Sequence, residues 1–369
     1  MPTTDTDPQH PDATPPTPSS TPHRAASLRH LSPGYFACVM ATGIVSIGLR
    51  EIGLPVASTV LLGLATFAYV ALWVLYGVRA VKYPDATLRD LRDPQTAFAY
   101  FTVVAGTGVV GVGFASVNLI AVASVLIAVT AGLWFIFGYL LPWQVLMQRD
   151  GQPILARADG TWFVWAVASQ SLAVGLAHVQ PYANVGGRWL SLLTVLSWSV
   201  GMALYAAVAL LVLLRIIVHG ITPAQFTPPY WVAMGALAIA VVAGANIVEM
   251  PADPVIDAAR SLIAGTVVIV WTLCAWLIPL LLAAGVWRHV VRRIRWEYEP
   301  GLWSMVFPMG MFGVASLSVA RADDIPSLEA IGGVVVVIAA AVWLIVGAAM
   351  VRRVTVDAWR AHRQRPRRV

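Results

Sequence analysis

The chain has 369 residues, of which 59% are hydrophobic and 11% are charged, and its formal net charge is +6. A water-soluble protein of this length cannot hide so much apolar surface, so the composition excludes a soluble fold. It indicates a membrane protein, and the alternating strands that a transmembrane barrel needs do not occur.

The two ends of the chain differ from the middle. Residues 1–31 are rich in Pro, Thr, Ser and Asp and contain no apolar run. Such a segment cannot bury enough surface to fold, so we expect a disordered tail there. Residues 352–369 are expected to form a second, basic tail that touches anionic lipid. Residues 32–351 then form one ten-helix membrane domain.

Ten apolar runs follow one another through this domain. Runs of about twenty residues can cross about 30 Å of hydrocarbon, and they must be helical to satisfy their own backbone hydrogen bonds. The predicted spans lie roughly at 33–49, 56–78, 96–116, 121–146, 161–177, 189–214, 230–248, 261–287, 301–320 and 328–351.

Every odd-numbered span begins with a Pro or Gly turn followed by aromatic residues. The starts read SPGYF from Ser32, DPQTAFAYF from Asp93, DGTWF from Asp159, PPYW from Pro228 and EPGLW from Glu299. A second, longer span follows each, which is a five-fold internal repeat of helical hairpins. We therefore predict an all-α membrane protein whose ten transmembrane helices form five hairpins with quasi-five-fold symmetry around a central pore. The odd helices would form the inner ring.

The basic residues predict the orientation. Of the 24 Lys and Arg residues, only Arg50, Arg188, Arg260 and Arg321 fall in the loops after odd-numbered spans. The other twenty fall in the tails and in the loops after even-numbered spans. Because basic loops stay in the cytoplasm, we predict a multi-pass cytoplasmic-membrane protein with both termini cytoplasmic. No domain that reads nucleic-acid bases accompanies the basic tail, so nucleic acid is not expected as a partner.

Side chains that carry chemistry are scarce. The ten predicted spans contain no Asp, Lys, Arg or His, and their one acidic residue is Glu329. Ionisable groups inside a membrane mark proton relays and ion-coupled sites, and haem needs buried His ligands. Cys38 and Cys274 form neither a disulfide framework nor a metal cluster. We therefore predict no catalytic residue, no cofactor and no metal site, and not an enzyme.

The odd spans do carry small polar residues. The candidates for a pore lining are Thr42, Ser46, Thr102, Thr107, Ser169, Asn246 and Ser304. The alternative is that these residues allow helices to pack closely. A neutral pore of hydroxyls and backbone would bind an anion weakly, and weak binding permits fast release.

Three segments resemble the tellurite-resistance/C4-dicarboxylate transporter family, which includes slow anion channels and transporters of malate and sulfite. They are SPGYFACVMATGIVSIGL in the first span, DGTWFVWAVASQSLAV in the fifth and LWSMVFPMGMFGVASLSVA in the ninth. The resemblance covers about residues 32–351. It implies ten helices in five hairpins, an inner ring of odd helices, an anionic small-molecule substrate and a homotrimer with one pore per protomer.

The resemblance also implies one site residue, because a phenylalanine on the ninth helix blocks the pore of channel members. The matching position is Phe307, which precedes Pro308. Proline removes a backbone donor and clashes with the preceding turn, so we expect a kink that directs the ring into the pore. The alternative is that Phe307 packs between helices.

These observations predict transmembrane transport of small anions or C4-dicarboxylates through a neutral pore gated by Phe307. An alternative within transport is proton-coupled dicarboxylate uptake or sulfite efflux. An alternative of another class is a membrane-bound enzyme or sensor without transport, which would need a catalytic cluster or a sizeable soluble domain. The family name does not make tellurite a substrate.

Overall fold

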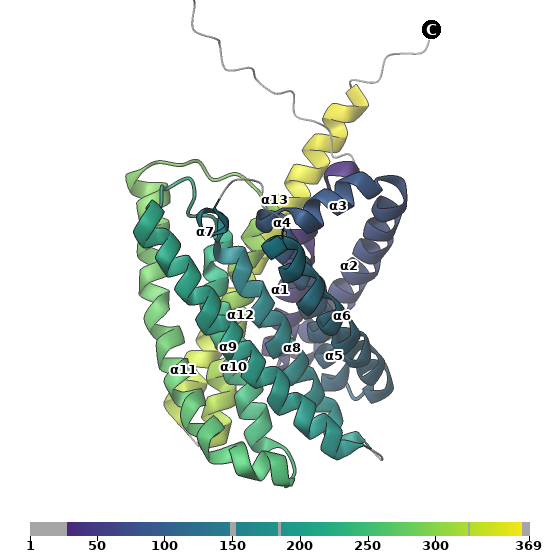
Figure 1. Cartoon of the computed structure of the whole chain (residues 1–369), viewed down its shortest axis with the longest axis vertical. Coiled ribbons are helices and arrows are strands. Elements are labelled where there is room, and N and C mark those ends of the chain that lie inside the picture. Colours follow the sequence, from purple (N-terminus) through teal and green to yellow (C-terminus); the bar gives the residue numbers. More distant parts are fainter. Residues whose placement is uncertain (1–27, 148–152, 184–185, 324, 364–369) are drawn as a thin grey trace, which may run out of the picture.

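The computed structural model describes residues 28–147, 153–183, 186–323 and 325–363. Within these ranges ten helices are long and apolar enough to cross a membrane, and no strand occurs (Figure 1). Their helical parts are α1 (Phe36–Glu51), α2 (Pro55–Lys82), α5 (Phe101–Ser116), α6 (Ile120–Met147), α8 (Phe163–Val179), α9 (Gly187–His219), α10 (Val232–Glu249), α11 (Pro254–Val286), α12 (Trp303–Asp323) and α13 (Pro326–Arg363). The prediction of an all-α protein with ten membrane spans is confirmed.

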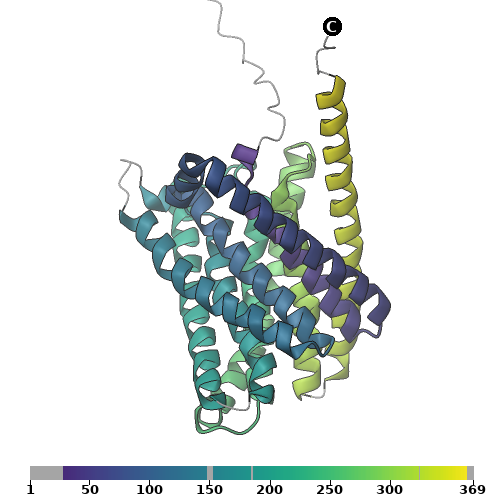
Figure 2. The same cartoon turned by 90° about the vertical axis from the view of Figure 1, so that its right-hand side faces the viewer.

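The chain enters and leaves the bundle at the same end. The short helix η1 (Leu28–His30) and the last turns of α13 both lie at the top of Figure 2. We call this end the termini face and the opposite end the far face. The predicted tail at 1–31 lies largely outside the described residues. The predicted basic tail starts as a helix, because α13 continues past Arg352 to Arg363.

The odd-numbered spans form the interior of the bundle. In their most apolar stretch 72–94% of the residues are buried, against 17–28% in the even-numbered spans. Contacts run from α1 to α5, α8, α10 and α12 and back to α1, so the inner helices close a ring. The quasi-five-fold symmetry of the hairpins stays a prediction.

A short 3-10 turn opens each inner helix at the termini face. These opening turns are η2 (Pro33–Tyr35), η3 (Phe98–Tyr100), η4 (Gly160–Trp162), η6 (Pro228–Trp231) and η8 (Pro300–Leu302). Ser32, Asp93 and Asp159 cap the first three hairpins by accepting a hydrogen bond from the N–H two residues later. Such caps satisfy donors that a helix start leaves unpaired. The five turns contact one another in a ring of the same order as the inner helices.

Hydrogen bonds between neighbouring hairpins connect the outer ring to the inner one. Trp134 of α6 donates to Ser169 of α8 at 2.7 Å, and Trp271 of α11 donates to Ser316 of α12 at 3.0 Å. Three further bonds complete the circle: Trp343 of α13 to Thr42 of α1, Trp198 of α9 to the Ala240 carbonyl of α10, and Thr107 of α5 to Tyr69 of α2. Each bond joins the outer helix of one hairpin to the inner helix of the next.

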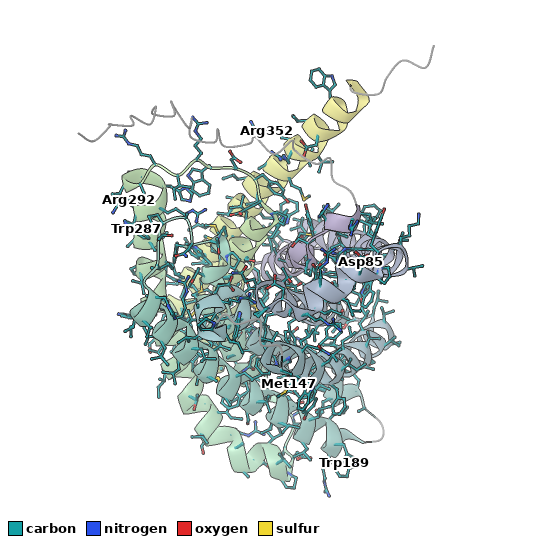
Figure 3. The ribbon with its side chains drawn as sticks, turned by 45° about the horizontal axis from the view of Figure 1, so that its top comes forward. Asp85, Met147, Trp189, Trp287, Arg292 and Arg352 are labelled. Carbon is teal, nitrogen blue, oxygen red and sulfur yellow. The ribbon has the colours of Figure 1, made fainter. Side chains whose placement is uncertain are left out.

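The termini face also carries the shorter helices α3 (Pro84–Arg92), α4 (Pro94–Ala97) and α7 (Ile154–Arg157). Figure 3 shows Asp85 of α3 at the same end of the molecule as Arg292 and Arg352, whereas Trp189 lies at the far face. Arg29 of η1 forms an ion pair with Asp85 at 2.7 Å, which holds the start of the chain against α3.

Candidate functional site

A cavity of about 140 Å³ lies at the far face, in the centre of the inner ring. All five inner helices contribute to its wall, so it coincides with the axis on which a pore was predicted. Its deepest layer consists of Ile44, Val109, Ser171, Ile239 and Met311. The next layer consists of Ile47, Val112, Val174, Val242 and Val314. Nine of these ten side chains are apolar, so the wall is hydrophobic below its mouth.

The mouth of the cavity is polar. It is formed by Glu51, His178, Asn246, Glu249, Ser318 and Arg321. Arg321 donates to Glu51 at 3.0 Å, an ion pair between the last turns of α12 and α1. Asn246 lies 3.5 Å from the imidazole Nδ1 of His178, which itself lies 2.8 Å from the Val174 carbonyl. The mouth thus holds two carboxylates, one guanidinium and one imidazole.

These charged groups correct the expectation of an uncharged interior. The predicted spans ended at 49, 177, 248 and 320, whereas the helices continue to Glu51, Val179, Glu249 and Asp323. A hydropathy pattern ends a span at the first ionisable residue. The hydropathy pattern therefore could not reveal that polar side chains in the last helical turns line a shared cavity.

Phe307 lies one helical turn below the deepest layer of the cavity. It precedes Met311 by four residues, and residues at this spacing share a helix face. The equivalent positions on the other inner helices are Met40, Ala105, Val167 and Gly235. We call these five residues the closing layer. All are buried, and the Phe307 side chain is only 1% exposed.

Pro308 packs directly against Gly235 of α10. A Cβ atom on Gly235 would lie 2.8 Å from Cγ of Pro308, so glycine is required for this approach. Pro308 lies inside α12, where it leaves the Ser304 carbonyl without its usual backbone donor. The predicted kink at this point stays a prediction.

The structure places one of the seven pore-lining candidates at the cavity, namely Asn246. Thr42, Thr107 and Ser169 instead bond to Trp343, Tyr69 and Trp134 of the outer helices.

The remaining three candidates also lie away from the cavity. Ser46 bonds to Ser58 of α2, Thr102 donates to the Ala99 carbonyl, and Ser304 is half-buried outside the cavity wall. For Thr42, Thr107 and Ser169 the physical reason is that an outer-ring indole or phenol needs a partner inside the bilayer. Composition could not distinguish this outward-facing use of a hydroxyl from a pore lining.

No group of three or more His, Cys, Asp or Glu side chains in the described ranges is arranged to hold a metal ion. Cys38 and Cys274 are both free thiols.

Comparison with known proteins decides the family. A family profile described as "Voltage-dependent anion channel" matches residues 30–351. The chain belongs to the voltage-dependent anion channel family. The resemblance seen in the first, fifth and ninth spans is thereby confirmed over nearly the whole chain.

Three known proteins illustrate what this chain is similar to. An uncharacterized transporter of Methanocaldococcus jannaschii is 23% identical over 317 residues, which cover 83% of this chain and 88% of the relative. A second such transporter is 22% identical over 297 residues, covering 77% and 83%. An uncharacterized membrane protein of Mycobacterium tuberculosis H37Rv is 46% identical over 162 residues, covering 44% and 82%. Family and names point to transport or channel activity rather than to catalysis.

Proposed function

We propose that this protein conducts small anions, including C4-dicarboxylates, along the axis of the inner ring, and that the closing layer is its gate. The observation that carries the proposal is the cavity lined by all five inner helices. Phe307 is the aromatic member of the closing layer beneath the cavity, which it forms together with Met40, Ala105, Val167 and Gly235. Gly235 contacts Pro308, which holds the part of α12 that carries Phe307 against α10.

A hydrophobic wall suits a gated path. Narrow apolar constrictions exclude water, and an anion cannot pass until they widen enough to become wet. The valine and isoleucine layers above Phe307 offer no fixed charge, so an anion that enters is bound weakly and leaves fast. Moving Phe307 aside would join the cavity to the termini face.

A second candidate is a proton-coupled carrier for dicarboxylates or sulfite. Glu51, Glu249 and His178 favour it, because they place exchangeable protons where an anion would enter. Flux that follows the membrane potential without moving protons would favour the channel. Acidification of the compartment that receives the substrate would favour the carrier.

We further propose that both termini face the cytoplasm and that the protein assembles as a homotrimer in the cytoplasmic membrane. The basic residues of α3, α13 and the α11–α12 connection all lie at the termini face, as the rule for basic loops requires. The trimer is proposed from what the family resemblance implies. Native mass spectrometry from detergent would give three times the chain mass.

The gate is tested by Phe307→Ala in protein reconstituted into liposomes. We expect chloride and succinate flux to rise on the order of tenfold, since each 1.4 kcal/mol removed from a barrier gives about that factor. Phe307→Leu, which keeps part of the volume, should give an intermediate rise. Retention of helicity and of a single elution peak verifies folding.

The matched control is Phe312→Ala on the same helix. Phe312 is also buried, but it stacks on Trp271 of α11 with ring centroids 5.8 Å apart. It should lose stability without a rise in flux. Equal or lower flux in folded Phe307→Ala than in the wild type would refute the gate. No anion flux by any variant under any gradient would instead favour a sensor or enzyme.

A further inference from the structure

A second and larger cavity lies at the termini face, away from the axis of the inner ring. Its volume is about 820 Å³, within the range of sites that hold small molecules. The walls come from the start of the chain at Arg29–Pro33, the end of α2, the helices α3 and α4, and Arg157 of α7. Five arginines and two aspartates face it, an excess of three positive charges.

The floor of the cavity is built around Arg79. This residue is only 2% exposed and donates to Asp90 at 2.6 Å, to the Tyr100 hydroxyl at 3.4 Å and to the Arg29 carbonyl at 3.2 Å. These bonds fix η1, α2, α3 and η3 against one another. The cavity therefore has a rigid base, made of a buried charge that is already paired.

The two lining carboxylates are both committed elsewhere. Asp90 accepts from Arg79, and Asp93 accepts the Gln95 N–H as a helix cap. Outside the lining, Asp85 is shared between Arg29 at 2.7 Å and Arg89 at 3.2 Å, through the same oxygen. The guanidinium of Arg92 has no hydrogen-bonding or ionic partner within the described parts of the chain. Three of the five arginines thus have a carboxylate partner, and with Asp85 counted the excess around the cavity is two positive charges.

We infer that this cavity binds a multiply charged phosphate anion. The arginine guanidinium donates two parallel hydrogen bonds to a pair of phosphate oxygens. A phosphomonoester or pyrophosphate group carries two or more negative charges, which would balance the excess positive charge of the cavity. The cavity lies at the termini face, beyond the start of the inner helices, so in a bilayer both lipid headgroups and soluble phosphates could reach it. Either a phosphorylated lipid headgroup or a free polyphosphate supplies this chemistry. The inference does not depend on anion transport.

Such a ligand would join segments that are far apart in sequence. Arg29 and Ser32 precede α1, whereas Arg89 and Arg92 lie on α3, and all four residues line the same cavity. Ser32 caps η2, and its carbonyl accepts a hydrogen bond from Tyr76 of α2. Binding would therefore stabilise the start of the first inner helix against α3.

The test uses full-length protein in nanodiscs of neutral phosphatidylcholine and measures binding by titration. One arm adds inorganic tripolyphosphate, and the other adds soluble dioctanoyl phosphatidylinositol 4-phosphate. We expect saturable binding in at least one arm, weakened at least about tenfold by Arg89→Gln combined with Arg92→Gln, because two charge-assisted contacts are lost. The arm that saturates at the lower concentration identifies the source of the phosphate.

The matched control is Arg292→Gln combined with Arg293→Gln, two arginines of the same face that do not line the cavity. It should change the affinity by less than about twofold. Equal weakening by both double variants, no saturation in either arm, or equal competition by chloride at the same concentration would overturn the inference. Arg89 and Arg92 are exposed, so their variants should fold, and an unchanged elution profile and helicity verify this.

Discussion

At the scale of single residues, three small polar groups of the inner helices bond to the outer ring of helices. Thr42, Thr107 and Ser169 each lie six residues after the phenylalanine that begins an inner helix, namely Phe36, Phe101 and Phe163. Each bonds to an aromatic side chain of the outer ring. Within a bilayer such bonds replace water as the partner of an indole or phenol.

This use of the hydroxyls predicts the effect of Thr42→Val. The Trp343 indole would lose its acceptor, and we expect a loss of about 0.5–1.5 kcal/mol in the free energy of unfolding, with unchanged anion selectivity. Trp343→Phe should lose a similar amount. The measurements are reversible unfolding in mixed micelles and anion permeability ratios in liposomes.

The matched control is Thr272→Val, because Thr272 is exposed and donates only to the carbonyl of its own helix at Ile269. It should leave the free energy of unfolding nearly unchanged. A change in anion selectivity for Thr42→Val with normal stability would contradict the packing role and restore Thr42 as a pore-lining residue.

At the scale of secondary-structure elements, the ring of opening turns positions the inner helices. The turns η4 and η6 approach closely, since a Cβ atom on Gly160 would lie 2.4 Å from backbone atoms of Pro229 and Tyr230. Backbone cannot rotate away as a flexible side chain can. The glycine of the DGTWF start is therefore required by contact between hairpins, a reason that its own hairpin does not reveal.

We therefore expect Gly160→Ala to destabilise the protein by about 1–3 kcal/mol, the usual range for overpacking, or to prevent its accumulation. Gly138→Ala is the matched control, since no atom lies within 4 Å of the position of its Cβ. In the middle of α6 alanine should be neutral or stabilising by up to about 1 kcal/mol. The measurement is the melting temperature of each variant in thermal unfolding. Equal melting temperatures would show that η4 and η6 are not packed closely enough to require glycine at position 160.

At the scale of the whole molecule, the sequence predicted most of the fold but only a small part of the candidate site. The ten spans and five hairpins follow from long uncharged runs and from the repeated Pro or Gly starts, which are local signals. The cluster of Glu51, His178, Glu249 and Arg321 joins the ends of four helices. Such a cluster forms only when the inner helices pack into a ring, so no local sequence pattern predicts it. Phe307 was reached only through family resemblance, because a Phe-Pro pair by itself does not say which way the ring points.

At the same scale, the excess of carboxylates at the far mouth predicts the effect of Glu249→Gln. The far mouth holds two carboxylates beside one arginine, and that arginine is paired with Glu51 at 3.0 Å. A negative charge at a narrow mouth lowers the local concentration of anions. Removing the Glu249 charge should therefore raise anion influx from the far face about two- to tenfold at low ionic strength. At about 1 M salt the Debye length falls to about 3 Å, and the increase should largely disappear.

Asp257→Asn is the matched control for this experiment, because Asp257 also lies near the far face but pairs with Arg260 outside the cavity. Its influx should stay close to that of the wild type at both salt concentrations. The measurement is the initial rate of chloride influx into liposomes in which the far face points outward. If both variants raised the rate equally, the surface potential of the whole face would control access. If Glu249→Gln left the rate unchanged at low salt, anions would not pass this mouth. The proposal that anions move along the axis of the inner ring would then be refuted.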